Sequence, residues 1–233
     1  MTLATSWWRG QPTRRLRHIP NVLSVNLPMM AHNAQGQVSE ARSRLLETAT
    51  RLFYAEGIHS VGIDRIVAEA KVTRATLYRH FPGKEELVVA YLQAVHQADR
   101  EQVGEALGSG RPAADILRAI AKSIAGGIQS NGFRGCAFLN AVAEYPDPEH
   151  PVHQAVLAHR EWFLRTITDL LGQVGETPPE LAGRHFVMLR DGAMAEGCLA
   201  DPVEVCDTFL QGVDGILQHR IASTSPRPGA KTA

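Results

Sequence analysis

The side chains best suited to contacting a charged partner are concentrated in residues 71–84, KVTRATLYRHFPGK. This stretch supplies guanidinium, hydroxyl, imidazole and ammonium donors, which can bond to phosphate oxygens and to the edges of nucleic acid bases. If the stretch is helical, Leu77 and Phe81 form its inward face. The polar side chains that then point elsewhere are Arg74, Thr76 and His80.

Several of these side chains have two interpretations. Arg74 could form two hydrogen bonds to a guanine, worth about 1–3 kcal/mol of discrimination, or could contact phosphates of any sequence. Tyr78 could donate to a phosphate or pack half-buried against the first helix. His80 could contact DNA or cap the end of its own helix. Lys84 begins the next helix, so its ammonium and the helix N-terminus could hold one phosphate together.

Composition excludes several classes of protein. The chain has 233 residues, of which 44% are hydrophobic and 21% are charged, which is typical of a globular protein and excludes wholesale disorder. No apolar run approaches the roughly 18–20 residues of a membrane-spanning helix, and the N-terminus lacks the apolar core of a signal peptide. Three cysteines at no metal-like spacing argue against a disulfide framework or a zinc site. We expect a cytoplasmic protein with no membrane partner.

Charge is distributed unevenly although the formal net charge is zero. Residues 1–38 hold four arginines and no acid, whereas residues 39–95 hold eight basic and seven acidic residues. The remainder holds twelve basic and seventeen acidic residues. A polyanionic partner should therefore meet the N-terminal half.

A helical period begins at residue 39, and no strand alternation is convincing anywhere, so we predict an all-α fold of about nine helices. Ser39 and Gly57 are the expected caps of the first helix. Two short helices follow, the second at about 74–80, and then a long helix from Lys84. Further helices are expected at about 113–129, 137–144, 149–172, 179–199 and 203–221.

These elements predict a three-helix domain over residues 39–83 and a larger helical domain over 84–222. Residues 1–38 are predicted to be a disordered basic leader and 223–233 a disordered tail. The leader has two interpretations. It could track DNA phosphates as a basic arm, or it could be an upstream extension from a misassigned start.

Two short helices joined by a tight turn behind a longer helix form a helix-turn-helix, whose second helix enters the major groove. The run FYAEGIHSVGIDRIVAEAKVTRATLYRHFPGKEELVVAYL resembles the DNA-binding domain of the TetR/AcrR family of bacterial transcriptional regulators, most specifically in TLYRHF-x-x-KEEL. The resemblance implies a homodimer with helices one to three on an operator. It also implies a larger domain that holds a small-molecule effector, and a dimer interface made by the last two long helices.

The resemblance also assigns residues. Lys71 stands where the family often has glycine, at a cost of about 1 kcal/mol if its backbone is left-handed. Gly62 stands where a Ser or Thr often caps the second helix, and caps only slightly less well. Arg74, Ala75 and Thr76 occupy places that approach base edges. The complete set of expected DNA-binding residues is Lys71, Thr73, Arg74, Ala75, Thr76, Tyr78, His80 and Lys84.

The middle helices carry bulky apolar residues that could line an effector pocket or form solid core, which periodicity alone does not separate. Glu144, Arg160 and Arg190 would orient the effector if they point inward. The segment GCAFLNAVAEYPDPEHPVHQAVLAHREW resembles the effector domain of one subgroup and specifies no ligand. The candidate pocket residues are Phe133, Phe138, Trp162, Phe163, Phe186 and Met188.

The last helix carries an apolar stripe too wide for a lone surface helix, so we expect it to meet a partner. The predicted dimer interface comprises Leu181, His185, Leu189, Cys206, Leu210, Val213 and Leu217.

Two other constellations have functional and structural interpretations. His150, His153 and His159 could bind a metal, but Pro151 separates the first two and no Cys or Asp completes a known pattern. Cys136 could sense oxidants if its pKa were lowered, or could be an ordinary buried cysteine.

No phosphate-binding glycine loop, GxSxG elbow or HExxH motif is present, so we expect neither an enzyme nor a cofactor. The predicted function is a repressor that a small molecule releases from an inverted-repeat operator. The alternatives are an all-α small-molecule-binding or interaction protein without a specific operator, and an activator without ligand.

Overall fold

The computed structural model describes residues 40–175 and 178–223, with the side chains of 219–223 left aside. The predicted leader, the Ser39 cap and the tail beyond Ser223 lie outside these residues. The described part of the chain is entirely helical, which confirms the predicted fold class. Its helices are α1 (Glu40–Glu56), α2 (Ile63–Ala70), α3 (Arg74–His80), α4 (Lys84–Leu107), α5 (Ala113–Ile128), α6 (Ala137–Glu144), α7 (Pro151–Val174), α8 (Pro179–Glu196) and α9 (Pro202–Ser223).

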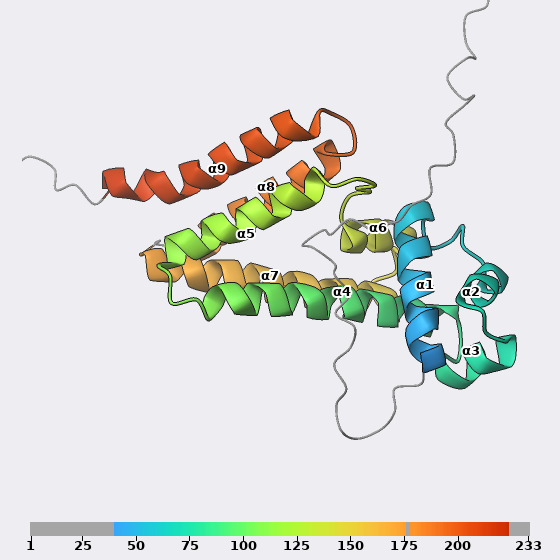
Figure 1. Ribbon diagram of the computed structural model, residues 1–233. Helices are drawn as coiled ribbons and strands as arrows, with labels where there is room; N and C mark the ends of the chain where they lie inside the picture. The colour runs from blue at the N-terminus through green and yellow to red at the C-terminus, as the bar shows by residue number, and fades with distance from the viewer. Residues whose placement is uncertain (1–39, 176–177, 224–233) are drawn as a thin grey trace, which may run out of the picture.

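Helices α1–α3 form a separate cluster at one end of the molecule, which we term the head (Figure 1). Its core is built by the periodic apolar faces of the three helices, because Leu52 of α1, Ile66 of α2 and Leu77 of α3 are completely buried. Gly57 ends α1 with a φ of 91°, the left-handed conformation in which glycine is favoured. The expected cap is therefore confirmed.

The turn between α2 and α3 depends on a strained residue. Lys71 has φ 54° and ψ 47°, and it is the one non-glycine residue with positive φ in the described part of the chain. Its N–H donates to the carbonyl of Ala68 at 3.2 Å, which closes α2. Thr73 then begins α3 by accepting a hydrogen bond from the Thr76 N–H at 3.1 Å. The left-handed conformation predicted for Lys71 is confirmed.

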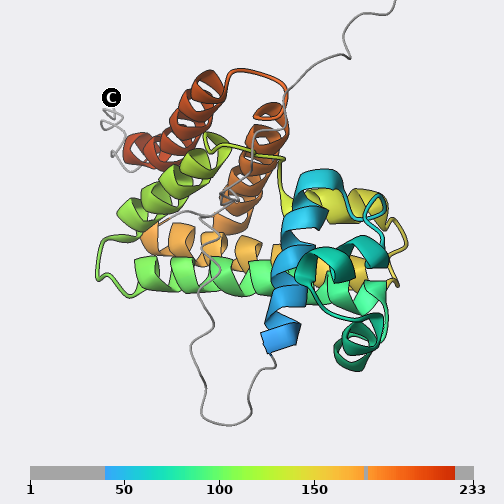
Figure 2. The same cartoon turned by 45° about the vertical axis from the view of Figure 1, so that its right-hand side comes forward.

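Helices α4–α9 form the larger part, which we term the body. The 24-residue helices α4 and α7 run side by side, and α8 packs against both α7 and α9 (Figures 1 and 2). Helix α5 lies against α4, α7 and α9, which encloses a core containing Phe186 and Phe209. The predicted helix at 179–199 ends earlier, at Glu196. None of the described helices is long and apolar enough to cross a membrane.

We expect Lys71→Gly to stabilise the protein. A left-handed conformation costs a non-glycine residue about 1–2 kcal/mol, which glycine avoids. Glycine also makes the unfolded chain more flexible, which offsets about 0.4–1 kcal/mol of this gain. The free energy of unfolding should therefore rise by about 0.5–1 kcal/mol relative to Lys71→Ala, which removes the same charge but keeps the strain. Urea denaturation measures both variants. A glycine variant less stable than the alanine variant would contradict the strain.

Candidate nucleic-acid interface

Helix α3 presents a row of exposed side chains while Leu77 anchors it to the head. Arg74 and Ala75 are exposed at its start, and Tyr78 has 48% of its surface exposed. Of the remaining predicted DNA-binding residues, Lys71 and Thr73 are exposed, and Thr76, His80 and Lys84 are partly buried.

Arg74 is held by a partner that the sequence analysis did not single out. Its Nε donates to Oδ1 of Asp64 and its Nη2 to Oδ2, each at 2.5 Å. Asp64 lies in the first turn of α2, so this ion pair joins the starts of two helices. The hydrogen bonds to the Asp64 carboxylate raise the pKa of Arg74 above its usual value.

The predicted roles of His80 and Lys84 are modified by burial. His80 Nε2 is buried and has no hydrogen-bond partner among the described residues, so this nitrogen is not available to a phosphate. Lys84 is partly buried at the start of α4. This desolvation lowers its pKa, while the negative charge of Glu144 acts in the opposite direction. The ammonium therefore stands at the junction of head and body.

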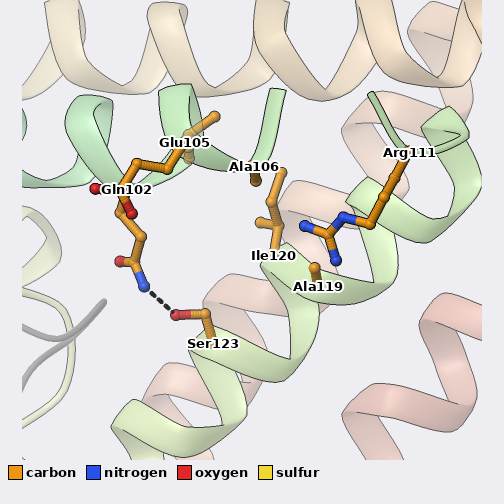
Figure 3. Close-up of a pocket in the computed structure, with 8 residues that line it drawn as sticks. Gln102, Glu105, Ala106, Arg111, Ala119, Ile120 and Ser123 are labelled. Carbon is orange, nitrogen blue, oxygen red and sulfur yellow. Dashed lines mark hydrogen bonds between the residues drawn. The ribbon is translucent and has the colours of Figure 1, made fainter. Parts of the chain in front are cut away.

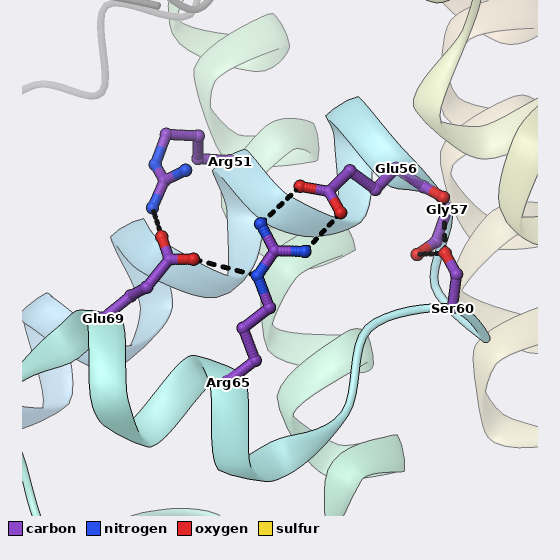
Figure 4. A network of polar contacts seen from close by, with 6 residues as sticks. All are labelled: Arg51, Glu56, Gly57, Ser60, Arg65 and Glu69. Atoms are coloured by element: carbon purple, nitrogen blue, oxygen red, sulfur yellow. Dashed lines mark hydrogen bonds and ion pairs between the residues drawn. The ribbon is translucent and has the colours of Figure 1, made fainter. Parts of the chain in front are cut away.

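Four charged side chains fix α2 against α1 (Figure 4). Arg65 donates through Nη2 to Glu56 at 2.7 Å and through Nε to Glu69 at 2.9 Å, and Arg51 also contacts Glu69. The hydrogen bonds to Glu56 and Glu69 raise the pKa of Arg65. The hydrogen bond from Arg51, and after it the one from Arg65, lowers the pKa of Glu69. Each exposed pair alone stabilises little. Together they bridge the two helices that support α3.

Both ends of α6 are tied to the head. Before α6, the hydroxyl of Tyr54 donates to the Gly135 carbonyl and accepts from the Arg134 N–H, both at 3.0 Å. Burial raises the pKa of this phenol to about 12, so it remains a donor at neutral pH. At the end of α6, Glu144 accepts from the N–H groups of Ile58 at 2.8 Å and His59 at 2.6 Å. Glu144 therefore does not point into a pocket, as its proposed role in orienting an effector required.

The candidate effector residues fall into two groups. Phe138, Phe163 and Phe186 are buried in the body, and Phe133 and Trp162 are partly buried. Met188 is 71% exposed, so it lies outside this interior and lines a groove between α8 and α9 instead.

A polar cluster lies among these aromatic residues. Arg190 is 6% exposed and donates through Nη1 to the Cys136 sulfur at 3.3 Å and to Asp191 at 2.9 Å. Arg160 also bonds to Asp191, at 2.6 Å. Arg190 Nε and the Oδ1 of Asp99 are buried without a partner in the described part of the chain. The cation that bonds to the Cys136 sulfur is therefore Arg190, whereas the sequence had suggested Arg134.

Burial sets the protonation states around this cluster. It raises the pKa of Asp99 to about 7, although the charge of Arg190 acts in the opposite direction. It lowers the pKa of His159 to about 2, assisted by the charges of Arg190, His96 and Arg160. The neutral His159 ring stacks on Phe138 of α6 with their centroids 3.5 Å apart.

Each of the three histidines considered for metal binding makes its own contact with a different part of the protein. His150 Nδ1 accepts from the Val152 N–H at 3.2 Å, and His153 Nδ1 donates to the Tyr145 carbonyl at 2.8 Å. His159 is the stacked ring described above. Within the described residues, no group of three His, Cys, Asp or Glu side chains is arranged to hold a metal ion.

A cleft of about 260 Å³ opens between α4 and α5 (Figure 3). Gln102 donates to the Ser123 hydroxyl at 2.7 Å, while its own Oε1 is buried without a partner in the described chain. Val103 and Ile120 provide apolar lining, and Arg111 lies at the α5 side. Gln102 lies one helical turn after Asp99, on the same face of α4.

The predicted dimer residues divide between surface and core. Leu181 and His185 are exposed, and Leu189 and Leu210 are partly exposed. Of these four, Leu189 lines a groove of about 470 Å³ between α8 and α9. Three other predicted interface residues are packed inside the single chain, where α9 meets α5, and their prediction is corrected. The Cys206 thiol, for example, donates to the Ala125 carbonyl at 3.2 Å. These core residues are Cys206, Val213 and Leu217.

Comparisons with known proteins agree on one family. The family described as "Bacterial regulatory proteins, tetR family" matches residues 45–91. The crystal structure of SCO4454, a TetR-family transcriptional regulator from Streptomyces coelicolor, is 67% identical to this chain. That match covers 77% of this chain and 95% of SCO4454, with a TM-score of 0.75.

Curated relatives are more distant. The transcriptional regulator LmrA of Bacillus subtilis is 28% identical over 86 residues, which cover 36% of this chain and 46% of LmrA. The regulator YjdC of Escherichia coli is 23% identical over 157 residues, which cover 66% of this chain and 81% of YjdC. The chain thus spans less than half the length of LmrA.

We expect Asp99→Asn to change how stability depends on pH. Because the carboxyl has a pKa of about 7 when folded and about 4 when unfolded, the folded state binds the extra proton between these values. Asp99 therefore stabilises the protein fully at low pH, and this contribution is lost as pH rises toward 7. Neutral His159 acts in the opposite direction, because the unfolded chain binds its proton below about pH 6.5.

The measurement is urea denaturation at about pH 5 and pH 7.5. Relative to Asp99→Asn, the wild type should gain on the order of 2 kcal/mol at the lower pH. Asp169→Asn, on the exposed face of α7, is the control and should follow the wild type. Parallel profiles for wild type and Asp99→Asn would contradict a raised pKa at Asp99.

Proposed function

Because the chain belongs to the TetR family of transcriptional regulators, we propose that it is a dimeric repressor released from an inverted-repeat operator by a small molecule. The observation that carries DNA recognition is the exposed row of α3, which starts at Arg74 and continues through Tyr78, on a short helix fixed by α1 and α2. Two such helices in a symmetric dimer would enter successive major grooves about 34 Å apart.

The DNA-binding surface extends from α3 to the start of α4. Tyr78 offers an exposed hydroxyl to a phosphate, and Lys84 offers an ammonium beside the first N–H groups of α4. Glu85 and Glu86 occupy the same turn and partly offset this attraction. We therefore assign Lys84 a single phosphate contact and assign base recognition to α3.

The dimer interface is proposed on the groove between α8 and α9. Met188, which lines this groove, is 71% exposed. Leu181 of α8 and Val203 of α9 are 46% and 57% exposed, so the same two helices carry further exposed apolar side chains. A second copy related by twofold symmetry would cover both grooves at once and remove this surface from water. The proposed occupant is therefore another copy of the chain.

The effector is proposed to bind inside the body, at the polar cluster of Asp99 and Arg190. Burying a polar group without a hydrogen bond costs about 1–3 kcal/mol, and both residues carry such an atom. A ligand offering a donor to Asp99 and an acceptor to Arg190 would satisfy them. The cleft at Gln102 supports an approach from the surface between α4 and α5.

Helix α6 is the proposed link between effector and DNA. Its Phe138 stacks on His159 beside the polar cluster, while Glu144 and the loop carbonyl of Gly135 bond to the head. A ligand that displaces the stacked rings would shift α6 and turn the head. Release requires that the ligand bind the shifted form more tightly by several kcal/mol.

We expect Lys84→Ala and Tyr78→Phe to weaken binding to all DNA sequences, because both side chains are assigned to phosphates. Loss of Lys84 should also lower the slope of log affinity against log salt by about one. Fluorescence anisotropy with labelled duplexes at several salt concentrations measures both effects. Lys122→Ala, an exposed lysine on α5 in the body, should bind as the wild type does. Unchanged binding by both head variants would overturn the assigned surface.

We expect Met188→Glu to produce monomers in sedimentation experiments, because the proposed interface would bury two unpaired carboxylates. The matched control is Leu107→Glu, which places the same charge on an apolar residue of α4 that is 46% exposed. Val213 is unsuitable for this test because it is only 1% exposed within one chain. A persistent Met188→Glu dimer would place the interface elsewhere.

A further inference from the structure

We propose that Asp64 determines DNA sequence specificity by positioning Arg74 so that its free edge reads a guanine. The proposal rests on the proposed function, in which α3 enters the major groove. It concerns a residue of α2 that makes no base contact itself. Asp64 is thus a positioning residue, and Arg74 is the residue that touches the base.

The geometry of the guanidinium leads to this inference. The group is planar and presents two hydrogen-bonding edges, one along Nε and one Nη, and one across the two Nη atoms. Asp64 occupies the first edge, through Nε and Nη2 at 2.5 Å each. The second edge retains N–H donors on Nη1 and Nη2. Two parallel donors of this kind match the O6 and N7 acceptors of guanine in the major groove.

The pair is supported by fixed backbone on both sides. Asp64 lies in the first turn of α2, where a negative charge is favoured by the helix dipole, and its neighbour Arg65 bonds to α1 and to Glu69. Arg74 is the first residue of α3, directly after the Thr73 cap. A recognition side chain held between two rigid elements is better defined than one held by a flexible loop.

The pair also separates the two interpretations of Arg74. A contact with phosphates depends on the positive charge of Arg74, and the negative charge of Asp64 neutralises that charge locally. Base recognition depends on the direction in which the Arg74 guanidinium points. The ion pair fixes this direction by restricting a side chain that is otherwise free to rotate. Both side chains are largely exposed in the free protein, at 61% and 74%, so the pair contributes little to folding. Exclusion of water in the groove would strengthen it.

A competing role for Asp64 predicts a different result. If the carboxylate merely withheld Arg74 from DNA, its removal would raise affinity for every duplex by the same factor. If it positions Arg74, its removal raises affinity for unrelated DNA, since a negative charge near phosphates is lost, but reduces discrimination at one guanine in each half-site.

The experiment uses the full-length protein. Duplexes bound by the wild type are selected from a random library, and each guanine of the best duplex is replaced in turn by 7-deazaguanine, which lacks the N7 acceptor. Anisotropy then measures binding by the wild type, Asp64→Asn and Arg74→Met. Asp115→Asn removes a matched carboxylate, one paired with Arg118 on α5 of the body, and is the control.

For the wild type and Asp115→Asn, one 7-deazaguanine per half-site should weaken binding about tenfold or more. For Asp64→Asn the same replacement should cost less than about threefold, and for Arg74→Met it should cost nothing. Wild-type discrimination in Asp64→Asn, or a uniform rise in its affinity, would overturn the proposal while leaving the proposed function intact. Failure of the wild type to select any preferred duplex would overturn both.

Discussion

The structure depends on the hydrogen bonds that attach both ends of α6 to the head. Tyr54 bridges the carbonyl of Gly135 and the N–H of Arg134, and Glu144 accepts two backbone N–H groups beyond α1. These bonds leave α6 little freedom to move without the head. The orientation of α3 therefore depends on a helix whose other face packs inside the body, against His159.

Local rules of sequence predicted much of the fold. Periodicity located the helices because each buries one face, as Leu52 does in α1 and Leu77 does in α3. The left-handed conformation of Lys71 followed from the family resemblance, because Lys71 stands where the family often has glycine. Helix boundaries differed by a few residues, as at Glu196, since several adjacent residues can end a helix.

Long-range pairs were not predictable in the same way. Asp64 and Arg74 are ten residues apart, and Glu144 lies 86 residues from Ile58, so no local spacing identifies either contact. The α9 stripe was correctly identified as apolar, but sequence does not distinguish packing on α5 of the same chain from packing on a second chain. Val213 therefore belongs to the core of the single chain, although its place in the apolar stripe of α9 resembles that of residues at the surface.

The central claim is that the exposed row of α3 recognises a particular DNA sequence. The most direct test is fluorescence anisotropy with a duplex from upstream of the protein's own gene, beside a scrambled duplex of equal composition, at two salt concentrations. Preference for the native duplex by about a thousandfold, retained at the higher salt, is the predicted result. Equal binding to both duplexes that weakens together with salt would contradict the claim, because charge attraction alone would then account for the affinity.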